Sequence, residues 1–161
     1  MIQKEIKTVV FEYSSEKELS EKDQELISRA REALKKAYAP YSKFNVGACV
    51  LLANGEMFSG NNQENAAYPS GLCAERVALF YANSVFPDVP DETIAICASN
   101  ENGYVPTPVP PCGSCRQVLL ESEIRFNHSI KVILIGSAII QVIEGIQQLL
   151  PLNFQKDNLF E

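Results

Sequence analysis

The spacing of apolar positions along the chain alternates between that of helices and that of strands. Apolar residues recur every three or four positions in some segments and form nearly continuous runs in others. The pattern predicts helices at 20–38, 74–82, 114–122 and 145–150, and strands at 45–53, 56–60, 93–99, 131–137 and 139–143. Asn54-Gly55 predicts a two-residue hairpin turn, and Pro40 is expected to end the first helix. Strands and helices alternating in this way predict a single three-layer α/β domain.

Two segments of the chain have patterns of their own. Residues 6–13 are rich in β-branched and aromatic side chains, which fits either a strand or an ordered arm. We therefore expect an N-terminal extension over residues 1–19, an arm or an edge strand, followed by one domain over residues 20–161. The predicted helix 74–82 has little polar face, so it should be buried on most sides, in the core or against a partner subunit.

Composition narrows the class of protein. The chain of 161 residues is 46% hydrophobic and 21% charged, which is typical of a soluble globular protein. It contains no apolar run long enough to cross a bilayer, and residues 1–7 lack the apolar stretch of a signal peptide, so we expect a cytoplasmic protein without a membrane partner. A formal net charge of −6 argues against binding to nucleic acid, which usually requires a basic patch.

Three of the five cysteines lie outside the apolar strands. Cys49 and Cys97 fall within predicted strands, where a free cysteine behaves as a small buried hydrophobe. The other three are Cys73 and the Cys-x-x-Cys pair Cys112 and Cys115. A Cys-x-x-Cys pair alone also occurs in redox motifs. A third cysteine followed two residues later by a carboxylate makes the combination a much more specific indication of a metal site.

The residue types indicate a catalytic zinc site, with Cys73, Cys112 and Cys115 as ligands. Structural zinc normally has four protein ligands, whereas catalytic zinc keeps one position open for water. The single histidine, His128, is far from the cysteines in sequence. Glu75 is then free to act as general acid and base, although an exposed helical carboxylate is the alternative reading. Both cysteine groups come where a loop enters a predicted helix, and helix N-termini stabilise thiolates.

Two arginines adjoin the predicted site in sequence, Arg76 and Arg116. Three thiolates leave zinc with a net negative environment, which weakens it as a Lewis acid. We expect at least one guanidinium to hydrogen-bond the cysteine sulfurs and withdraw negative charge, and Arg76 is the stronger candidate. The alternative is that both arginines form ordinary ion pairs.

The motifs of the chain strongly resemble those of the small cytidine deaminases, the homotetrameric class with an all-cysteine zinc site. The resemblance extends over residues 37–154. It is carried by Tyr38-Ala39-Pro40-Tyr41-Ser42-Lys43-Phe44-Asn45-Val46-Gly47-Ala48, Asn62-Gln63-Glu64-Asn65-Ala66-Ala67-Tyr68, Cys73-Ala74-Glu75-Arg76, Pro111-Cys112-Gly113-Ser114-Cys115-Arg116-Gln117 and Leu149-Leu150-Pro151-Leu152-Asn153-Phe154. It implies a three-layer α/β/α fold with a mixed five-stranded central sheet and one catalytic domain.

The resemblance also implies roles for single residues and for the assembly. Phe44 would stack on the pyrimidine, Asn62 and Glu64 would hold the ribose 3′-hydroxyl, and the Ala74 backbone would meet the base. Tyr68 and Phe154 would reach the active site of a neighbouring subunit in a homotetramer with shared sites and one Zn²⁺ per subunit. The alternatives are that Phe44 and Phe154 are core aromatics and that Asn62 is a turn residue.

The function implied is hydrolytic deamination of cytidine and deoxycytidine to the uridines, with release of ammonia, as in pyrimidine salvage. A carboxylate at Glu64 bonded to a 3′-hydroxyl would repel a 3′-phosphate, which favours free nucleosides over polynucleotides. Three alternatives stay open: a deaminase acting on another aminopyrimidine such as blasticidin S, a non-catalytic zinc-binding module, and a nucleic-acid-editing deaminase. The first twenty residues lie outside the resemblance, and a longer loop at 100–110 departs from the family pattern.

Overall fold

A computed structural model describes residues 1–160 of the chain. Its α-helices and strands are β1 (Phe11–Tyr13), α1 (Glu21–Leu34), β2 (Asn45–Leu52), β3 (Met57–Asn61), α2 (Ala74–Val85), β4 (Asp91–Asn100), β5 (Gly103–Tyr104), α3 (Gly113–Phe126), β6 (Lys131–Ile135) and β7 (Ile140–Glu144). Within residues 1–160, no helix is both long enough and apolar enough to span a membrane.

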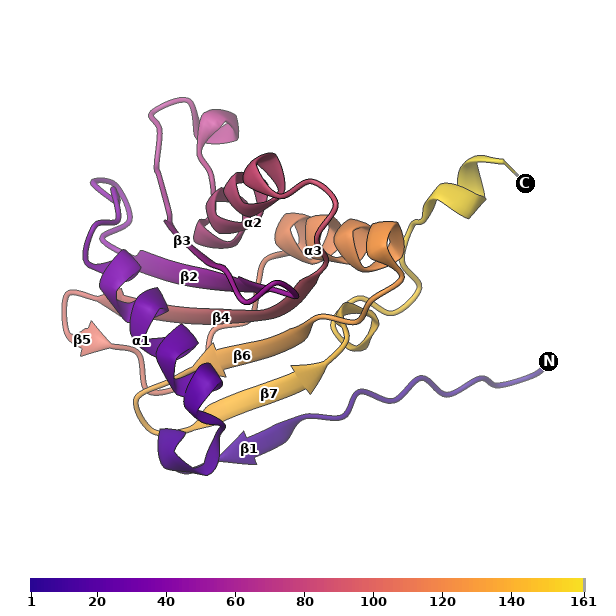
Figure 1. The fold of residues 1–161 in the computed structure, drawn as a ribbon, viewed down its shortest axis with the longest axis horizontal. Helices are drawn as coiled ribbons and strands as arrows, with labels where there is room; N and C mark the ends of the chain where they lie inside the picture. Colours follow the sequence, from indigo (N-terminus) through magenta and orange to yellow (C-terminus); the bar gives the residue numbers. More distant parts are fainter. Residues whose placement is uncertain (161) are drawn as a thin grey trace.

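The strands form one mixed sheet in the order β1-β7-β6-β4-β2-β3, with β5 added beside β4 (Figure 1). The β4–β6 pair is parallel and the other pairs are antiparallel. The mixed α/β class is confirmed, but the sheet has seven strands where five were predicted. Of the two additional strands, β1 lies within residues 6–13, where a strand was one of the two expectations. The other, β5, is only two residues long, which is too short to leave a periodic pattern in the sequence.

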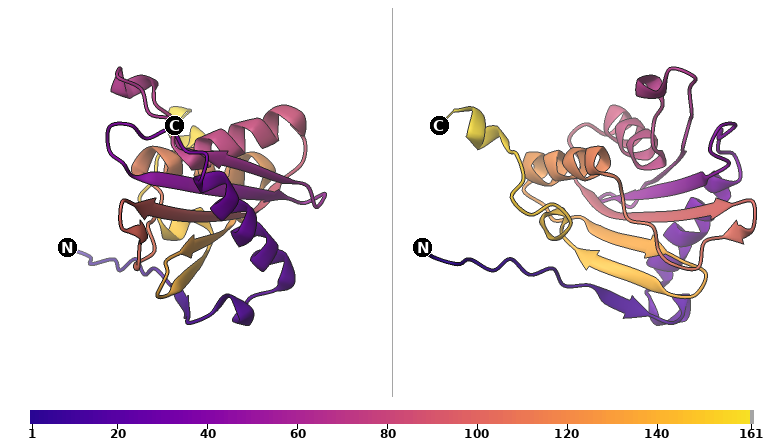
Figure 2. Two further views of the ribbon diagram at one scale, coloured as in Figure 1. Left: turned by 90° about the vertical axis from the view of Figure 1, so that its left-hand side faces the viewer. Right: turned by 180° about the vertical axis from the view of Figure 1, so that it is seen from behind.

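Helices cover both faces of the sheet, which confirms the three-layer arrangement (Figure 2). On one face, α1 packs Leu26, Ile27 and Ala30 against strand residues that include the buried Cys49 and Cys97. On the other face, α2 and α3 pack against the opposite side of the same strands. Cys49 is 0% exposed and Cys97 is 1% exposed, so their prediction as core residues is confirmed.

The first helix ends four residues earlier than predicted, at Leu34 instead of Tyr38. The Tyr38 backbone pairs with another segment: its N–H donates to the Asn62 carbonyl (3.0 Å), and its carbonyl accepts from the Glu64 N–H (2.8 Å). These long-range bonds replace the helical ones, so Pro40 does not terminate the helix. They bring residues 38–44 beside residues 62–64, two of the segments expected to bind substrate.

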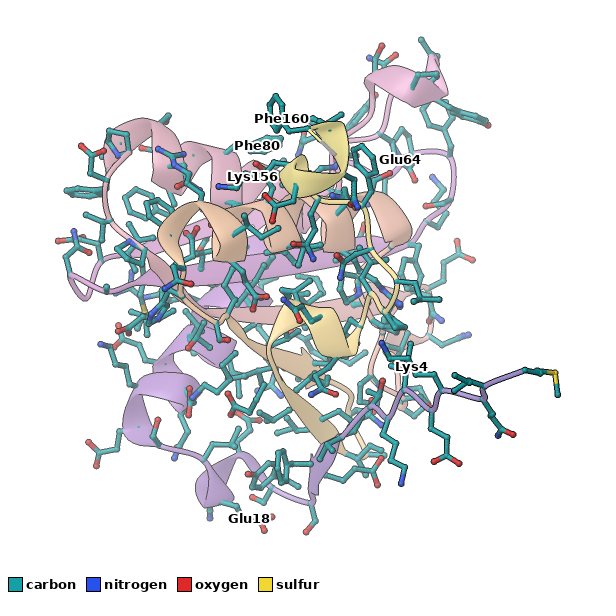
Figure 3. All side chains as sticks on the ribbon, turned by 90° about the vertical axis from the view of Figure 1, so that its right-hand side faces the viewer. Lys4, Glu18, Glu64, Phe80, Lys156 and Phe160 are labelled. Atoms are coloured by element: carbon teal, nitrogen blue, oxygen red, sulfur yellow. The ribbon has the colours of Figure 1, made fainter. Side chains whose placement is uncertain are left out.

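The N-terminal segment leads to β1, which pairs with β7 at the edge of the sheet. Further upstream, the Thr8 hydroxyl donates to the Gln148 carbonyl (2.7 Å), and the Val9 N–H donates to the Gln148 side chain (3.2 Å). The preceding residues run away from the body of the protein, as Lys4 illustrates in Figure 3. A separate extension over residues 1–19 stays a prediction.

A buried polar cluster lies between β4, α2 and α3. Asp91 is 1% exposed, and its Oδ2 accepts hydrogen bonds from the Ser122 hydroxyl and, at 3.4 Å, from the Asn83 amide. Its other carboxyl oxygen, Oδ1, has no hydrogen-bond partner among residues 1–160. Burial raises the pKa of Asp91, because the charged form loses hydration.

Substitution of Asp91 is expected to change how stability depends on pH. Since the folded-state pKa is raised, the folded protein keeps a proton that the unfolded chain loses above a pKa of about 3.9. Stability should therefore fall as pH rises toward the folded-state pKa, by up to about 1.4 kcal/mol per pH unit. Asp91→Asn should remove this slope and keep or raise the free energy of unfolding at pH 7. Urea unfolding from pH 4 to 8 measures both effects, with the exposed Asp88→Asn as control; an unchanged slope in Asp91→Asn would contradict the prediction.

Candidate active site

The N-termini of α2 and α3 bring three cysteines together. Cys73 is the N-cap residue of α2, Cys112 is the N-cap residue of α3, and Cys115 lies in the first turn of α3. Their sulfur atoms lie within 4.8 Å of one another, with 3.8 Å from Cys73 to Cys112 and 3.5 Å from Cys112 to Cys115. Two helix N-termini therefore point partial positive charge at one group of sulfurs, which favours thiolates.

The donor set fits a zinc ion with an open position. Within residues 1–160, the cysteines are the group of histidine, cysteine and acidic side chains arranged to hold a metal, and no fourth ligand joins them. Cys115 is buried, whereas Cys73 and Cys112 line a pocket. Three sulfur ligands with access from a pocket match a catalytic zinc site and not a closed structural one.

Neighbouring groups already favour ionisation of one thiol. A hydrogen bond from Cys115, supported by Arg76 and Cys112, lowers the pKa of Cys73 to about 5. The hydrogen bond to Cys73 and burial raise the pKa of Cys115, so Cys73 is the first of the pair to lose its proton. Arg76 Nη2 lies 3.8 Å from the Cys73 sulfur. This contact is the one expected for a guanidinium that withdraws charge from a thiolate ligand.

Replacement of Arg76 is expected to weaken the metal site. Arg76→Gln removes the positive charge beside Cys73, so zinc should dissociate faster, by up to the roughly ten- to hundredfold that loss of a partner of a metal ligand typically costs in metal affinity. Zinc transfer to a chromophoric chelator measures this rate. Arg29→Gln, on the exposed face of α1, is the matched control. Equal release rates for the two variants would assign Arg76 to a merely structural role.

Arg116 makes different contacts from those expected. Its Nε donates to the Pro111 carbonyl (2.8 Å), and its Nη1 donates to the Leu149 carbonyl (2.7 Å). The hydrogen bonds of the described residues include none from Arg116 to a cysteine sulfur. Both guanidinium bonds go to backbone carbonyls and neither to a carboxylate, so the alternative of an ordinary ion pair is not seen either.

Glu75 lies beside the cysteine cluster in the first turn of α2. It is 5% exposed and lines the same pocket as Cys73 and Cys112. Burial raises its pKa, with a further contribution from the charge of Cys73. An exposed helical carboxylate, the alternative reading of this residue, is therefore wrong. A buried carboxyl with a raised pKa suits a group that must both accept and donate protons near neutral pH.

The pocket has a volume of about 630 Å³, which suits a small ligand. It gathers eight of the predicted site residues, namely Phe44, Asn62, Glu64, Tyr68, Cys73, Glu75, Arg76 and Cys112. Further lining residues were not predicted: Tyr41, Ser42, Val46, Gln63, Asn65, Gly71, Leu72, Ile96, Val109 and Pro110. Val109 and Pro110 belong to the longer loop, so that loop does form part of the pocket wall.

Asn62 and Glu64 hold the loop that carries Phe44. The Asn62 side chain accepts from the Val46 N–H (2.7 Å) and donates to the Phe44 carbonyl (2.9 Å). Glu64 accepts from the Tyr41 N–H (2.9 Å) and from the Ser42 hydroxyl (2.5 Å). The bond from the Ser42 hydroxyl is the main cause of a lowered pKa at Glu64, so this pocket carboxylate stays ionised.

Ser42 is the pocket residue that sequence reasoning most clearly missed. Its hydroxyl donates to Glu64 and also accepts from the Phe44 N–H (3.0 Å). It therefore joins a predicted sugar-binding residue to the predicted base-stacking residue. A serine whose side chain bonds the backbone two residues later is a common turn signal, and this signal could have identified it.

The remaining predicted residues differ in their position. Ala74 is buried at the start of α2, next to Cys73. Tyr68 is 78% exposed, lines the pocket of its own chain and packs edge-on against Tyr41, with 6.3 Å between ring centroids. Phe154 is 58% exposed and is not among the residues that line the pocket. In a single chain, Phe154 is thus neither a core aromatic nor part of this pocket.

Known proteins are similar to this chain in sequence and in fold. Residues 20–128 match the family described as the cytidine and deoxycytidylate deaminase zinc-binding region. The cytidine deaminase of Halalkalibacterium halodurans is 48% identical over 99 residues, which cover 61% of this chain and 70% of the relative. The cytidine deaminase of Mycobacterium tuberculosis strain H37Rv is 37% identical over 109 residues, covering 66% and 77% of the two chains.

A solved structure agrees with the sequence matches. The crystal structure of cytidine deaminase from Burkholderia pseudomallei has a TM-score of 0.70 and 37% identity, and it covers 81% of this chain and 98% of that one. The family match includes all three clustered cysteines and Glu75. This chain therefore belongs to the cytidine and deoxycytidylate deaminase family.

Proposed function

We propose that the protein catalyses the zinc-dependent hydrolytic deamination of cytidine and deoxycytidine to uridine and deoxyuridine, with release of ammonia. The observation that carries this proposal is the buried Glu75 next to three clustered sulfurs, two of which, those of Cys73 and Cys112, line the same pocket as Glu75. Cys73, Cys112 and Cys115 would hold one Zn²⁺ per subunit, and Arg76 would withdraw charge from Cys73. When bound, zinc supplies the Lewis acid that makes water a nucleophile at neutral pH.

Glu75 performs the proton transfers in this proposal. The attacking water forms a bond to C4 of the pyrimidine and gives one proton to Glu75, which passes it to N3. The hydroxyl now on C4 gives up its proton, which the same carboxyl delivers to the amino group; the bond from C4 to that nitrogen breaks, ammonia leaves, and C4 becomes the carbonyl carbon of uridine. One carboxyl can do both because it accepts a proton as the carboxylate and donates it as the acid, and burial raises its pKa above the ordinary value, which makes it a stronger base.

The pocket wall supports selection of free nucleosides. Phe44 would stack on the base, the Ala74 backbone would contact it, and Asn62 with Glu64 would bind the sugar 3′-hydroxyl. Asn62 and Glu64 also fix the backbone around Phe44, so base and sugar contacts are prepared together. An ionised Glu64 at the sugar disfavours a 3′-phosphate, in line with the net charge of −6 and against a polynucleotide substrate.

We further propose a homotetramer with shared active sites. The outer face of α2 leaves Phe80, Tyr81 and Val85 between 46% and 58% exposed, which suits burial against another subunit. Tyr68 and Phe154 are exposed aromatics that a neighbouring copy could cover. The thiols of the cluster must stay reduced to bind metal, which is consistent with a cytoplasmic enzyme.

The proposal is tested by incubating zinc-loaded protein with cytidine while recording ultraviolet absorbance and released ammonia. We expect cytidine and deoxycytidine to be converted with one ammonia released per nucleoside, and cytidine 3′-phosphate to be converted much more slowly. Glu64→Gln should reduce the difference in conversion rate between cytidine and cytidine 3′-phosphate. Zinc-loaded protein that converts neither nucleoside would overturn the proposal. Turnover of another aminopyrimidine, zinc binding without turnover, or salt-sensitive binding to single strands would then identify which alternative holds.

A further inference from the structure

The first turn of α3 holds the C-terminal segment 149–154, here called the C-terminal strap. Arg116 directly follows Cys115, and its Nη1 donates to the Leu149 carbonyl (2.7 Å). Gln117, the next residue, donates from Nε2 to the Phe154 carbonyl (2.9 Å). The two side chains therefore hold the two ends of the strap, which runs beside α3 (Figures 1 and 2).

The same Arg116 guanidinium also holds the backbone next to the metal cluster. Its Nε donates to the carbonyl of Pro111, a buried residue that immediately precedes Cys112. A guanidinium is planar and its donors have a fixed arrangement, so the Pro111 and Leu149 carbonyls cannot move independently while both bonds are made. Arg116 thus joins the backbone at one cysteine ligand to the start of the strap.

We propose that Arg116 is a positioning residue that couples metal binding to the order of the C-terminal strap. Zinc fixes Cys112 and Cys115 relative to each other, which aligns Arg116 on both carbonyls and orders the strap. Because such coupling is reciprocal, an ordered strap also slows loss of zinc. The proposal rests on the zinc site of the proposed function. It gives Arg116 a task distinct from that of Arg76, which contacts a sulfur directly.

The coupling has a consequence for catalysis. The strap ends at Phe154, an exposed aromatic proposed to act at a neighbouring site. Loss of zinc from one subunit should therefore release the side chain that another subunit uses.

Hydrogen–deuterium exchange and zinc release test the proposal on the full-length protein. Removing zinc with a chelator should speed exchange in peptides covering residues 149–154 by about tenfold or more, while exchange in β7 changes little. Arg116→Gln should make strap exchange fast with or without zinc. It should also speed transfer of zinc to a chromophoric chelator, by up to the roughly ten- to hundredfold that loss of a residue supporting a metal ligand costs in metal affinity. Arg116→Lys keeps the charge but lacks the fixed planar arrangement of donors that bonds both carbonyls, so it should behave like Arg116→Gln.

Two comparison variants sharpen the test. Arg125→Gln removes another arginine of α3 that also donates to a backbone carbonyl, that of Pro87, at the far end of the helix. It should leave strap exchange and zinc release unchanged. Gln117→Ala removes the bond to the Phe154 carbonyl and leaves the bond to Pro111 in place, so it serves as the test if Arg116→Gln does not fold. It should speed strap exchange and zinc release by smaller factors than Arg116→Gln.

Either of two results would overturn the proposal: strap exchange in the wild-type protein that does not respond to zinc, or Arg116→Gln releasing zinc no faster than Arg125→Gln. The measurements need no turnover, and repeating them in Glu75→Gln protein keeps them independent of the deaminase reaction. If strap exchange responds to zinc as expected but the protein deaminates no nucleoside, this inference holds and the proposed function is wrong.

Discussion

Glu75→Gln is expected to lower turnover of cytidine by about a hundred- to ten-thousandfold while zinc stays bound. Glutamine has nearly the same shape as glutamate but cannot accept or deliver a proton, so the loss measures acid and base catalysis directly. Neutral glutamine also removes a buried carboxyl whose pKa burial has already raised, so the variant should fold at least as stably as the wild-type protein. Steady-state kinetics, zinc content and thermal unfolding of one preparation measure the three effects.

The comparison with Glu64→Gln separates chemistry from binding. Glu64 also lines the pocket, but its hydrogen bonds within residues 1–160 go to Tyr41 and Ser42 and not to a sulfur. Its replacement should mainly raise KM, whereas Glu75→Gln should mainly lower kcat. If Glu75→Gln retained most of its kcat, another group would have to move the protons, and the proposed role of Glu75 would be abandoned.

The chemistry of the site could be predicted from sequence because few residue types can perform it. Three cysteines outside the apolar strands, a glutamate two residues after one of them and a single distant histidine leave little choice for a metal site. The structure brings those cysteine sulfurs within 4.8 Å of one another and buries Glu75 beside them. Similarly, the strands β2, β4 and β6 carry long apolar runs, and burial between two layers of helices requires such runs.

The features that sequence reasoning missed depend on contacts between distant segments. The end of α1 is set by pairing of Tyr38 with residues 62–64 and not by Pro40, and no local pattern contains that pairing. Ser42 gains its importance from Glu64, and Arg116 from Leu149, 33 residues away. Adjacency to a cysteine led us to expect a sulfur contact from at least one of the two arginines, and the structure has it at Arg76, whereas Arg116 bonds two backbone carbonyls. Whether such an arginine reaches a sulfur or a backbone carbonyl depends on the direction in which its side chain leaves the helix, and adjacency in sequence does not specify that direction.

The cysteines themselves allow a prediction with an internal control. Cys115→Ser replaces one cluster sulfur with a hydroxyl, a poor zinc ligand, and turnover should fall by at least about a thousandfold because water is then no longer acidified from a pKa of 15.7 toward about 7. Bound zinc should drop well below one ion per chain. Cys97→Ala removes an equally buried sulfur from the opposite face of the sheet, where it belongs to the α1 core.

Cys97→Ala should keep full zinc content and turnover and lose about 1 kcal/mol of unfolding free energy, as is common for a small core deletion. Metal analysis, cytidine turnover and thermal unfolding with and without added zinc distinguish the two variants. Added zinc should raise the unfolding temperature of Cys97→Ala but not of Cys115→Ser, since metal binding stabilises only a fold that presents all three ligands. Full zinc content in Cys115→Ser would show that Cys115 is not a ligand. Loss of zinc from Cys97→Ala would show that zinc content depends on the stability of the core and does not identify the ligands.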